Sequence, residues 1–479
     1  MAEAQVIVAS NRGPVSFGEA DDGSLTSRRG GGGLVSGLSV AAKETDLLWV
    51  CAALSEADRR AARQAPGGRL DRAGHDTGGA AVRMLDIPPG VFQRAYNQIA
   101  NSTLWFVHHL LYDTPNAPRF DRRFRRDWEA YAEYNALFAD ALAAGAGRDA
   151  RAAVQDYHLT LAPRMLRERR PDLRIAHFSH TPWAPPDYYR MLPADIARDV
   201  LEGILGADHA GFLGRRWADA FMDCCEAVLG AAVDRDARTV THAGHRTRIG
   251  VHGLGTDGAE LRERAQAADV RARRAALLEA TGGRRLIVRV DRTELSKNIA
   301  RGLAAYRELL TVHPELRGEV VHLAFAYPSR HDLPEYREYT AAVQRLAQEI
   351  TDEFATPEWD PLILEVHDDY PRSLAAYRLA DVLLVNPIRD GMNLVAKEGP
   401  VLSERGCALV LSTEAGAAEE LAGDALMVNP YDVTGTAAAL YAALSLPEEE
   451  RRARSARLAA AATALPPDRW FADQLTALD

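Results

Sequence analysis

Ten consecutive residues, 389–398, combine charged side chains with the end of a predicted strand and the start of a predicted helix. They read Arg-Asp-Gly-Met-Asn-Leu-Val-Ala-Lys-Glu, and the Val- and Leu-rich segment 381–387 before them predicts a buried parallel strand. Pro387 and Gly391 mark the turn that ends it. Parallel sheets bind ligands at the carboxyl ends of their strands, and a helix N-terminus attracts phosphate. The run therefore indicates a sugar-nucleotide site, although an ordinary helix start with acidic first turns has the same composition.

Individual residues of this run suit different parts of a nucleotide sugar. If the helix begins near Asn393, its first free N–H groups point at the turn and suit a diphosphate. Glu398 lies one helical turn beyond Leu394 and can reach ribose hydroxyls. Asp390 can accept hydrogen bonds from a sugar.

A second charged run, 291–298, follows the predicted strand 286–290. Its cations Arg292 and Lys297 are expected at the diphosphate. No Asp-x-Asp metal motif is evident nearby, so these side chains and the helix dipole must balance the charge of a leaving group. A solvated loop is the alternative for this run alone, but its occurrence together with 389–398 favours a binding site.

The amino-terminal half carries polar and aromatic residues at the ends of predicted strands. Ser-Asn-Arg-Gly-Pro at 10–14 ends the first strand, and the glycines at 30–33 allow backbone to approach a phosphate or sugar closely. The glycines lack the GxGxxG spacing, which argues against a dinucleotide cofactor. Groups that suit a sugar ring follow at Tyr96, Asn97, Gln98, Trp105, Gln155, Asp156, His158, His177, His180 and Trp183. Asp156 and His158 have a spacing that metal sites also use, but no third ligand is obvious.

Composition limits the class of protein. The 479 residues, 47% of them hydrophobic, are enough for two domains of about 200 to 250 residues. A net charge of −10 argues against nucleic-acid or anionic-membrane partners. The chain begins with a short strand rather than a leader, and no segment has about 18 uninterrupted apolar residues, so we expect a cytoplasmic protein. The four cysteines show no CxxC spacing and are expected to be reduced core residues.

The elements that must position these residues follow an α/β pattern. Short apolar strands alternate with helical stretches, as in parallel sheets covered by helices on both faces. The strands form two groups, separated by a predicted hairpin and domain link at 232–255, and a second nucleotide-fold-like unit begins near Arg285. Prolines 466 and 467 let the last helix change direction. We expect two doubly wound domains with a ligand in the cleft between them.

Taken together, the motifs resemble those of the trehalose-6-phosphate synthases, a family of retaining glycosyltransferases. They occur in the family order: SNRGPV at 10–15, GGGLVSGL at 31–38, YNQIANSTLW at 96–105, QDYHL at 155–159, HFSHTPW at 177–183, DRTELSK at 291–297, YPSR at 327–330, RDGMNLVAKE at 389–398, EAGAAEEL at 414–421 and NPYD at 429–432. The resemblance implies the GT-B architecture of two Rossmann-like domains facing across a cleft. It implies an acceptor-binding domain at 1–240, a nucleotide-sugar-binding domain at 241–465 and a terminal helix at 466–479 that crosses back to the first domain.

The resemblance also implies roles for particular residues. The donor-binding set is Gly32, Gly33, Arg292, Lys297, Asp390, Asn393, Leu394, Val395 and Glu398. The set for glucose 6-phosphate is Arg12, Tyr96, Trp105, Asp156 and Arg330, with Arg12, Tyr96 and Arg330 nearest its phosphate. The catalytic set is His180, Asp390, Arg292 and Lys297, with His180 and Asp390 on hydroxyls of the donor sugar.

The implied activity is transfer of glucose from GDP- or UDP-glucose to glucose 6-phosphate with retention of configuration. The products are trehalose 6-phosphate and a nucleoside diphosphate, and neither a metal nor another cofactor is expected. In the implied front-face mechanism the departing phosphate oxygen helps deprotonate the acceptor, so catalysis rests on positioning and on stabilising the diphosphate. Partners other than these two substrates are not indicated, and the sequence leaves a homo-oligomer open.

Two departures from the family affect specificity. Many relatives have a second tryptophan three residues after the position of Trp49, where this chain has Ala52, so the wall of the acceptor pocket is expected to differ. The chain also carries Asp368 and Asp369 after a strand expected to flank the nucleobase, where some relatives carry an aromatic residue. A hypothesis is that one of them accepts hydrogen bonds from guanine and favours GDP-glucose; a solvated acidic pair is the alternative.

Other functions compete with this interpretation. A pseudo-glycosyltransferase that forms a C–N bond from a nucleotide-cyclitol donor shares the fold, but the retained runs 291–297 and 389–398 favour ordinary glucose transfer. A non-catalytic sugar-phosphate sensor is disfavoured because Arg292, Lys297 and Asp390 are all present. A synthase-phosphatase is not expected, since no DxDGT run occurs in these 479 residues.

Overall fold

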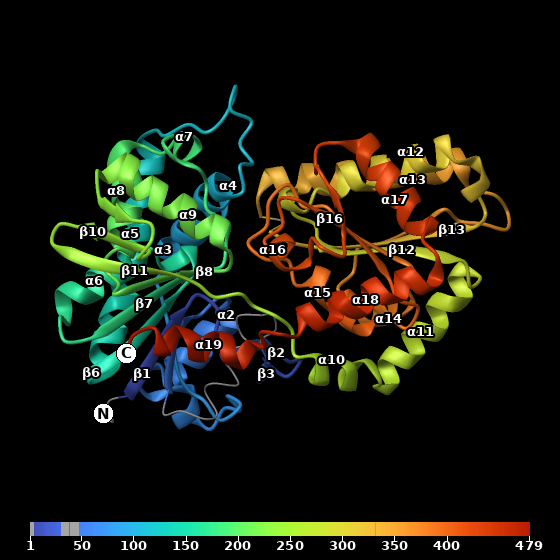
Figure 1. Ribbon diagram of the computed structural model, residues 1–479. Coiled ribbons are helices and arrows are strands. Elements are labelled where there is room, and N and C mark those ends of the chain that lie inside the picture. Colours follow the sequence, from blue (N-terminus) through green and yellow to red (C-terminus); the bar gives the residue numbers. More distant parts are fainter. Residues whose placement is uncertain (1–3, 30–37, 39–46, 331) are drawn as a thin grey trace. The chain divides into compact units, whose positions relative to one another are not determined.

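A computed structural model describes residues 4–29, 38, 47–330 and 332–479. The chain divides into two compact units (Figure 1). The first unit extends to Leu254 and is completed by Pro467–Asp479, whereas the second unit is Gly255–Pro466. Among the described residues, no helix is long and apolar enough to span a bilayer.

The first unit is built on a nine-stranded sheet that is parallel except at one edge. Its strands, in spatial order, are β5 (Ala81–Leu85), β4 (Leu47–Ala52), β1 (Ala4–Ser10), β6 (Ala146–Gln155), β7 (Arg174–Ser179), β8 (His209–Phe212), β11 (His245–Val251), β10 (Thr239–His242) and β9 (Ala232–Asp234). Its central strands consist largely of buried Val, Ile, Leu and Ala, because a parallel sheet is covered on both faces. A separate hairpin joins β2 (Val15–Glu19) to β3 (Leu25–Arg29).

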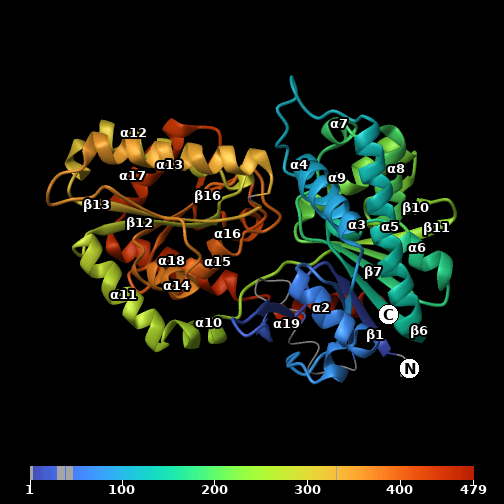
Figure 2. The same ribbon diagram turned by 180° about the vertical axis from the view of Figure 1, so that it is seen from behind.

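Helices cover this sheet. They are α2 (Glu56–Gln64), α3 (Pro89–Gln93), the π-helical segment η3 (Arg94–Leu104), α4 (Trp105–His108), α5 (Arg122–Gly145), α6 (Ala162–Arg169), α7 (Pro186–Tyr189), α8 (Ala194–Ile204), α9 (Arg215–Cys224) and α19 (Pro467–Thr476). The 24-residue α5 packs against β1 and β4 and also contacts η3. Figure 2 shows α5 beside α6. The four cysteines are free and buried, as expected from their spacing.

The second unit contains a six-stranded sheet in which every pair is parallel. Its strands, in spatial order, are β14 (Leu362–Glu365), β13 (Val320–Tyr327), β12 (Arg285–Arg292), β15 (Val382–Val385), β16 (Ala408–Ser412) and β17 (Leu426–Val428). Its helices are α10 (Gly258–Ala265), α11 (Ala268–Thr281), α12 (Ile299–Val312), α13 (Pro334–Phe354), α14 (Tyr370–Leu379), α15 (Val395–Leu402), α16 (Ala418–Leu421), α17 (Val433–Ser445) and α18 (Glu448–Ala462). Figure 1 shows α12, α13 and α17 on one face of this sheet, with α11, α14, α15 and α18 on the other.

The boundary between the units differs from the sequence-based expectation of 240/241. The second strand of the predicted hairpin, β11, pairs in parallel with β8 as far as Val251, which lies opposite Phe212. This pairing between segments far apart in the chain makes the hairpin the edge of the first sheet. The first unit therefore continues to Leu254.

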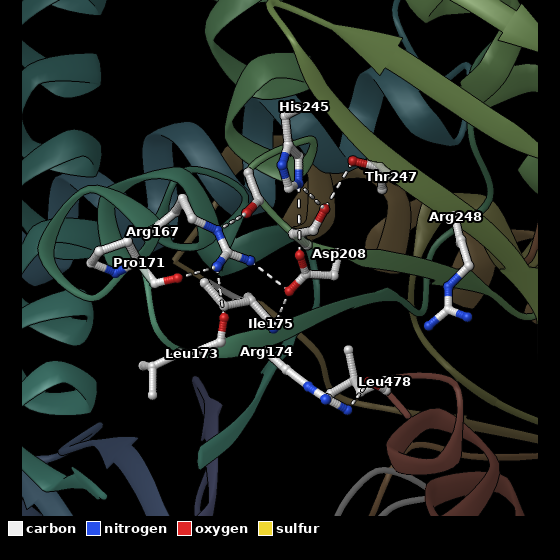
Figure 3. Close-up of polar contacts among 12 residues, drawn as sticks. Arg167, Pro171, Leu173, Arg174, Ile175, Asp208, His245, Thr247, Arg248 and Leu478 are labelled. Carbon is white, nitrogen blue, oxygen red and sulfur yellow. Dashed lines mark hydrogen bonds and ion pairs between the residues drawn. The ribbon is translucent and has the colours of Figure 1, made fainter. Parts of the chain in front are cut away.

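The carboxyl-terminal segment is held by arginines of the first sheet. Arg174 donates to the carbonyl of Leu478 over 3.0 Å, and Arg248 donates to the carbonyl of Ala477. Figure 3 shows the contact between Arg174 and Leu478 beside a second cluster, in which Asp208 accepts hydrogen bonds from Arg167 and from the backbone N–H of Ile175. The Asp208 cluster ties α6, β7 and the start of β8 together.

Candidate functional site

Two charged loops meet at the carboxyl ends of adjacent strands in the second unit. β12 pairs with β15, and the loops 293–298 and 386–394 follow them. The N–H of Ile388 donates to the carbonyl of Ser296 over 2.7 Å, so the loops are bonded to each other. The two runs that the sequence singles out, 291–298 and 389–398, are therefore neighbours in space.

Lys297 and Asp390 form the ion pair at the centre of this site. The Lys297 Nζ lies 2.6 Å from the Asp390 Oδ2, and both side chains are largely buried. Burial alone would lower the pKa of Lys297. The charges of Asp390, Asp291 and Glu294 outweigh burial and raise that pKa, so the ammonium group is charged at neutral pH. Asn393 donates a further hydrogen bond to the Asp390 Oδ2 over 3.2 Å.

The helix after this turn begins later than the sequence suggests. α15 starts at Val395, whereas Asn393 has a left-handed backbone with φ of 78°. The Asn393 side chain folds back and accepts the N–H of Ala396 over 3.2 Å. The expected anion site at the start of the helix therefore has Leu394 as its N-cap, and the first N–H groups of α15 have no acceptor within the helix.

Glu294 is a buried carboxylate that the sequence analysis missed as a site residue. Its side chain is fully buried, and its Oε1 lies 3.0 Å from a guanidinium nitrogen of Arg292 and accepts the Ser329 hydroxyl over 3.0 Å. Burial alone would raise the pKa of Glu294. The charges of Arg292, Arg330 and Lys297 outweigh burial and lower that pKa to about 2. Glu294 is thus a buried anion close to the cations of Arg292, Arg330 and Lys297.

Arg330 is placed by an unusual backbone conformation. Its φ is 49°, in the left-handed region, and its guanidinium donates to the Tyr336 hydroxyl over 2.7 Å. Arg330 lies in the second unit, within the domain expected at 241–465, and its charge acts on Glu294 after the end of β12. The order of the sheet explains this, because β13, which leads to the YPSR run, is the direct neighbour of β12.

Glu398 projects from the first turn of α15. Burial raises the pKa of Glu398 to about 7, even though a hydrogen bond from Tyr377 acts in the opposite direction. A carboxyl with this pKa changes its charge near neutral pH, and such groups are concentrated at functional sites. The Glu398 residue is half-buried.

The two candidate nucleobase residues have different environments. Asp369 is the N-cap of α14, and its Oδ1 accepts the N–H of Arg372 over 3.0 Å. Its Oδ2 lies 2.7 Å from the Nε of Arg273. Both carboxylate oxygens of Asp369 therefore have structural partners, whereas the neighbouring Asp368 is exposed.

In the first unit, Asp156 of the expected acceptor set and His180 of the expected catalytic set lie just beyond the carboxyl ends of β6 and β7. Asp156 has a φ of 76°, and its Oδ1 accepts the N–H of His180 over 3.1 Å. The His180 Nε2 lies 3.1 Å from the Oε1 of Gln155. Burial, and secondarily His177, lowers the pKa of His180 to about 3, so the imidazole is neutral. A neutral imidazole can hydrogen-bond a sugar hydroxyl without adding charge.

Aromatic rings surround this strand end. Tyr96 stacks on His158 with ring centroids 5.6 Å apart, and Trp105 stacks on His109 at 3.8 Å. Arg12 is exposed at the end of β1, and its carbonyl accepts the Ser10 hydroxyl. The structure thus places Arg12, Tyr96, Trp105, Asp156 and His180 in the first unit.

The remaining expectations concern glycines, metals and a core position. Gly32 and Gly33 lie outside the described residues. In the part of the chain that the structure describes, no group of three or more His, Cys, Asp or Glu is arranged to hold a metal ion. Ala52, the position where many relatives carry tryptophan, is buried, and its N–H donates to the carbonyl of Asn11 over 3.2 Å.

Comparisons with known proteins place the chain in a family. The model of glycosyltransferase family 20 matches residues 4–479. A trehalose-6-phosphate synthase from Mycobacterium sp. (strain JLS) is 33% identical over 487 residues, which cover 99% of this chain and 96% of that protein. A bifunctional trehalose-6-phosphate synthase/phosphatase from Thermoproteus tenax is 36% identical over 359 residues, and the match spans only 48% of that longer relative.

Solved structures agree with this placement. An E. coli structure described as bound with UDP-2-fluoro glucose has a TM-score of 0.85 at 28% identity, with 98% of each chain covered. The UDP-forming alpha,alpha-trehalose-phosphate synthase from Burkholderia xenovorans in complex with glucose-6-phosphate has a TM-score of 0.85 at 27% identity, with 99% of each chain covered. These similarities and the two largely parallel sheets confirm the expected α/β fold with two Rossmann-like domains. The chain therefore belongs to glycosyltransferase family 20 and is a glycosyltransferase with the fold of the trehalose-6-phosphate synthases.

Proposed function

We propose that this enzyme transfers glucose from a nucleotide-glucose donor to glucose 6-phosphate, with retention of configuration, and so forms trehalose 6-phosphate. The observation that carries the proposal is the buried pair of Lys297 and Asp390 at the meeting point of two strand ends, beside Arg292 and the start of α15. The relatives named as trehalose-phosphate synthases support the same substrates.

Each group of the second unit has a role in this reaction. Arg292, Lys297 and the backbone N–H groups of residues 393–395 bind the diphosphate, where negative charge grows as the bond to glucose breaks. Asp390 accepts hydroxyls of the glucosyl group, and Glu398 accepts those of the ribose. Because no carboxylate of this set is assigned as a nucleophile, the leaving diphosphate oxygen takes the proton of the acceptor hydroxyl on the same face of the sugar.

A second set of residues binds the acceptor. Glucose 6-phosphate contacts Arg12, Tyr96, Trp105, Asp156 and Arg330, with Arg12, Tyr96 and Arg330 nearest its phosphate. His180 bonds a donor-sugar hydroxyl as a neutral imidazole. Gly32 and Gly33 let the glycine loop approach the donor. Catalysis then depends on holding two substrates in line, which lowers the entropic part of the barrier.

The activity is tested by incubating the enzyme with glucose 6-phosphate and either UDP-glucose or GDP-glucose. We expect release of one nucleoside diphosphate for each disaccharide phosphate formed, and an α,α linkage in the product by NMR. Failure with both donors contradicts the proposal. In that case, turnover of a nucleotide-cyclitol donor to a C–N-linked product would favour the pseudo-glycosyltransferase. The alanine at position 52 is compatible with that alternative.

We further propose that UDP-glucose and GDP-glucose are both donors, and that Asp368 is the residue that recognises guanine. Several relatives are named UDP-forming, which supports uridine. The exposed carboxylate of Asp368 supports recognition of guanine, because it can accept hydrogen bonds from the N1–H and N2–H groups of that base. The carboxylate of Asp369 is instead bonded to Arg372 and Arg273.

The Asp368→Ala variant tests this assignment. We expect its kcat/KM for GDP-glucose to fall about tenfold, as for loss of one bidentate base contact, with little change for UDP-glucose. Asp369→Ala serves as the matched control and is expected to lower the melting temperature instead, since it removes a helix cap. Lack of any GDP-glucose turnover, or an equal loss with both donors in Asp368→Ala, would refute a role in guanine recognition.

A further inference from the structure

A small cavity in the first unit is lined almost entirely by polar side chains. It has a volume of about 220 Å³ and is formed by Gln93, Arg94, Gln98, Arg123, Arg126 and Asp127. The first three come from the junction of α3 and η3, and the others come from the first turns of α5. Because α5 packs against η3, the cavity lies between two helices that are fixed against each other.

The charges of this cavity are unbalanced. Three guanidinium groups face one carboxylate, Asp127, whose side chain is only 9% exposed. The single ion pair between them joins the Arg94 Nε to the Asp127 Oδ1 at 3.8 Å, which is too long for a hydrogen bond. Burial raises the pKa of Asp127, although Arg123, Arg94 and Arg126 act against it. One carboxylate cannot balance the charge of three guanidinium groups.

A neighbouring arginine on α5 forms an ion pair with a carboxylate outside the cavity. Arg125, on another face of the helix, is paired with Asp195. Within the described residues, neither Arg123 nor Arg126 forms an ion pair with a carboxylate. Arg123 and Arg126 are three residues apart and therefore share a face of α5, as Arg94 and Gln98 do on η3.

The backbone N–H groups in the first turn of α5 do not form the cavity's polar lining. The N-cap Asp121 already accepts the N–H groups of Arg123 and Phe124, over 2.8 and 3.0 Å. The dipole of the 24-residue helix still favours negative charge near its first turn. Side chains from α3, η3 and α5, rather than one helix terminus, thus define the cavity.

From this arrangement we propose that the cavity is a second anion site, which binds inorganic phosphate or the phosphoryl group of a small phosphate monoester. Guanidinium groups bind phosphate oxygens in bidentate fashion, and Arg94, Arg123 and Arg126 supply three of them. Gln93 and Gln98 add amide groups for the remaining oxygens or for a hydroxyl. The volume is below the roughly 300 Å³ at which pockets for larger ligands begin, so a phosphate with a small substituent fits best.

This site is separate from the acceptor residues on the same segment. Tyr96 lies midway between Arg94 and Gln98 along η3 and therefore points to roughly the opposite side. Its ring stacks on Phe92 and His158, with centroids at 5.1 and 5.6 Å. A phosphate in the cavity would hold the segment that carries Tyr96, so occupancy is expected to change the KM for glucose 6-phosphate; only this kinetic consequence rests on the proposed function.

The test is calorimetric titration of the full chain with inorganic phosphate and with glycerol 3-phosphate at constant ionic strength. The double variant Arg123→Gln/Arg126→Gln is expected to lose one class of phosphate sites, with binding there weakened at least about tenfold by the loss of two charge-assisted contacts. Arg122→Gln, which removes the same charge from the same helical turn but does not line the cavity, is the matched control and should bind as the wild type does. Preference for glycerol 3-phosphate over phosphate would identify a monoester site, and the reverse would identify a free-phosphate site.

The proposal is overturned if the double variant binds phosphate like the wild type, or if Arg122→Gln weakens binding as much. Melting temperatures verify that the variants are folded, and the exposed positions of the arginines favour this. Since binding is measured without turnover, loss of the glucosyl-transfer hypothesis would leave this result intact. A KM for glucose 6-phosphate that is insensitive to the double variant would remove only the kinetic consequence.

Discussion

Replacement of Lys297 by methionine is expected to lower kcat/KM for the nucleotide-glucose donor by about 1,000-fold, or about 4 kcal/mol of transition-state stabilisation. The ammonium group is nearly buried and is held in its charged form by Asp390, Asp291 and Glu294. Its charge is worth most where water is excluded and where the diphosphate gains charge as glucose departs. The loss should therefore appear mainly in kcat, measured under saturating donor.

A double-mutant cycle with Asp390→Asn separates catalysis from simple loss of a buried partner. Each single variant breaks the same ion pair. Lys297→Met leaves a buried carboxylate without its cation, and Asp390→Asn leaves a buried ammonium group without its anion. For stability, the double variant should be less damaged than the sum of the single variants. For kcat it should be as impaired as the worse single variant, because both groups are assigned to the donor.

Lys297→Arg is the conservative control. It keeps the positive charge but not the 2.6 Å geometry with Asp390, and we expect an intermediate kcat. Wild-type kcat in Lys297→Met would show that the ammonium does not stabilise the leaving diphosphate, and the assignment of this strand end as donor site would then fail.

Replacement of Glu294 by glutamine is expected to lower kcat/KM by about 100-fold, although Glu294 is not assigned to any substrate. Its carboxylate touches Arg292 and is close to Arg330 and Lys297. The neutral amide keeps the volume and the bond to Ser329, so the change removes the charge that holds the cations in place. A positioning role predicts that the KM of the donor rises together with the fall in kcat.

The same variant has a stability signature that depends on pH. The pKa of Glu294 is about 2 in the folded chain, below the usual 4.5 of a free glutamate. A lowered pKa in the folded state stabilises the protein at pH above 4.5, and this contribution disappears as the pH falls from 4.5 to 2. The difference between the two pKa values contributes about 3 kcal/mol to the free energy of unfolding above pH 4.5.

Urea unfolding of wild type and Glu294→Gln at pH 6 and at pH 3 measures this difference. The difference in the free energy of unfolding between the two proteins should be larger at pH 6 than at pH 3. Ser329→Ala is the matched control, because it removes only a neutral hydrogen-bond partner of Glu294 and should cost about 1 kcal/mol at pH 6. A Glu294→Gln enzyme with unchanged kcat/KM would show that the cations are positioned without it.

The parts of the site that the sequence predicted are those set by local pattern. Val- and Leu-rich strands followed by charged loops placed Arg292, Lys297 and Asp390 at the carboxyl ends of parallel strands, and the pairing of β12 with β15 makes them neighbours. This needed only the rule that such strand ends share one edge of a sheet. The roles of these residues stay proposals.

What the sequence missed depends on tertiary environment. Glu294 follows Arg292 by two residues in the chain, yet its proposed importance comes from complete burial and from Arg330, which follows the neighbouring strand β13. The boundary at Leu254 depended on the pairing of β11 with β8. The capping role of Asp369 had a local signal, because an Asp directly before a helical stretch is a common N-cap.

The docking of α19 has a consequence for the order in which the protein is made. Gln155 joins His180 to Gln474, at 3.1 and 3.2 Å, and the Trp470 ring lies 5.3 Å from that of His180. His180 thus obtains its surroundings from residues that a ribosome adds more than 280 positions later, after the whole second unit. During synthesis, the contacts of α19 with Gln155 and His180 can therefore form only after the second unit has been added. The proposed role of His180 therefore depends on a segment, 467–479, that is synthesised after the second unit.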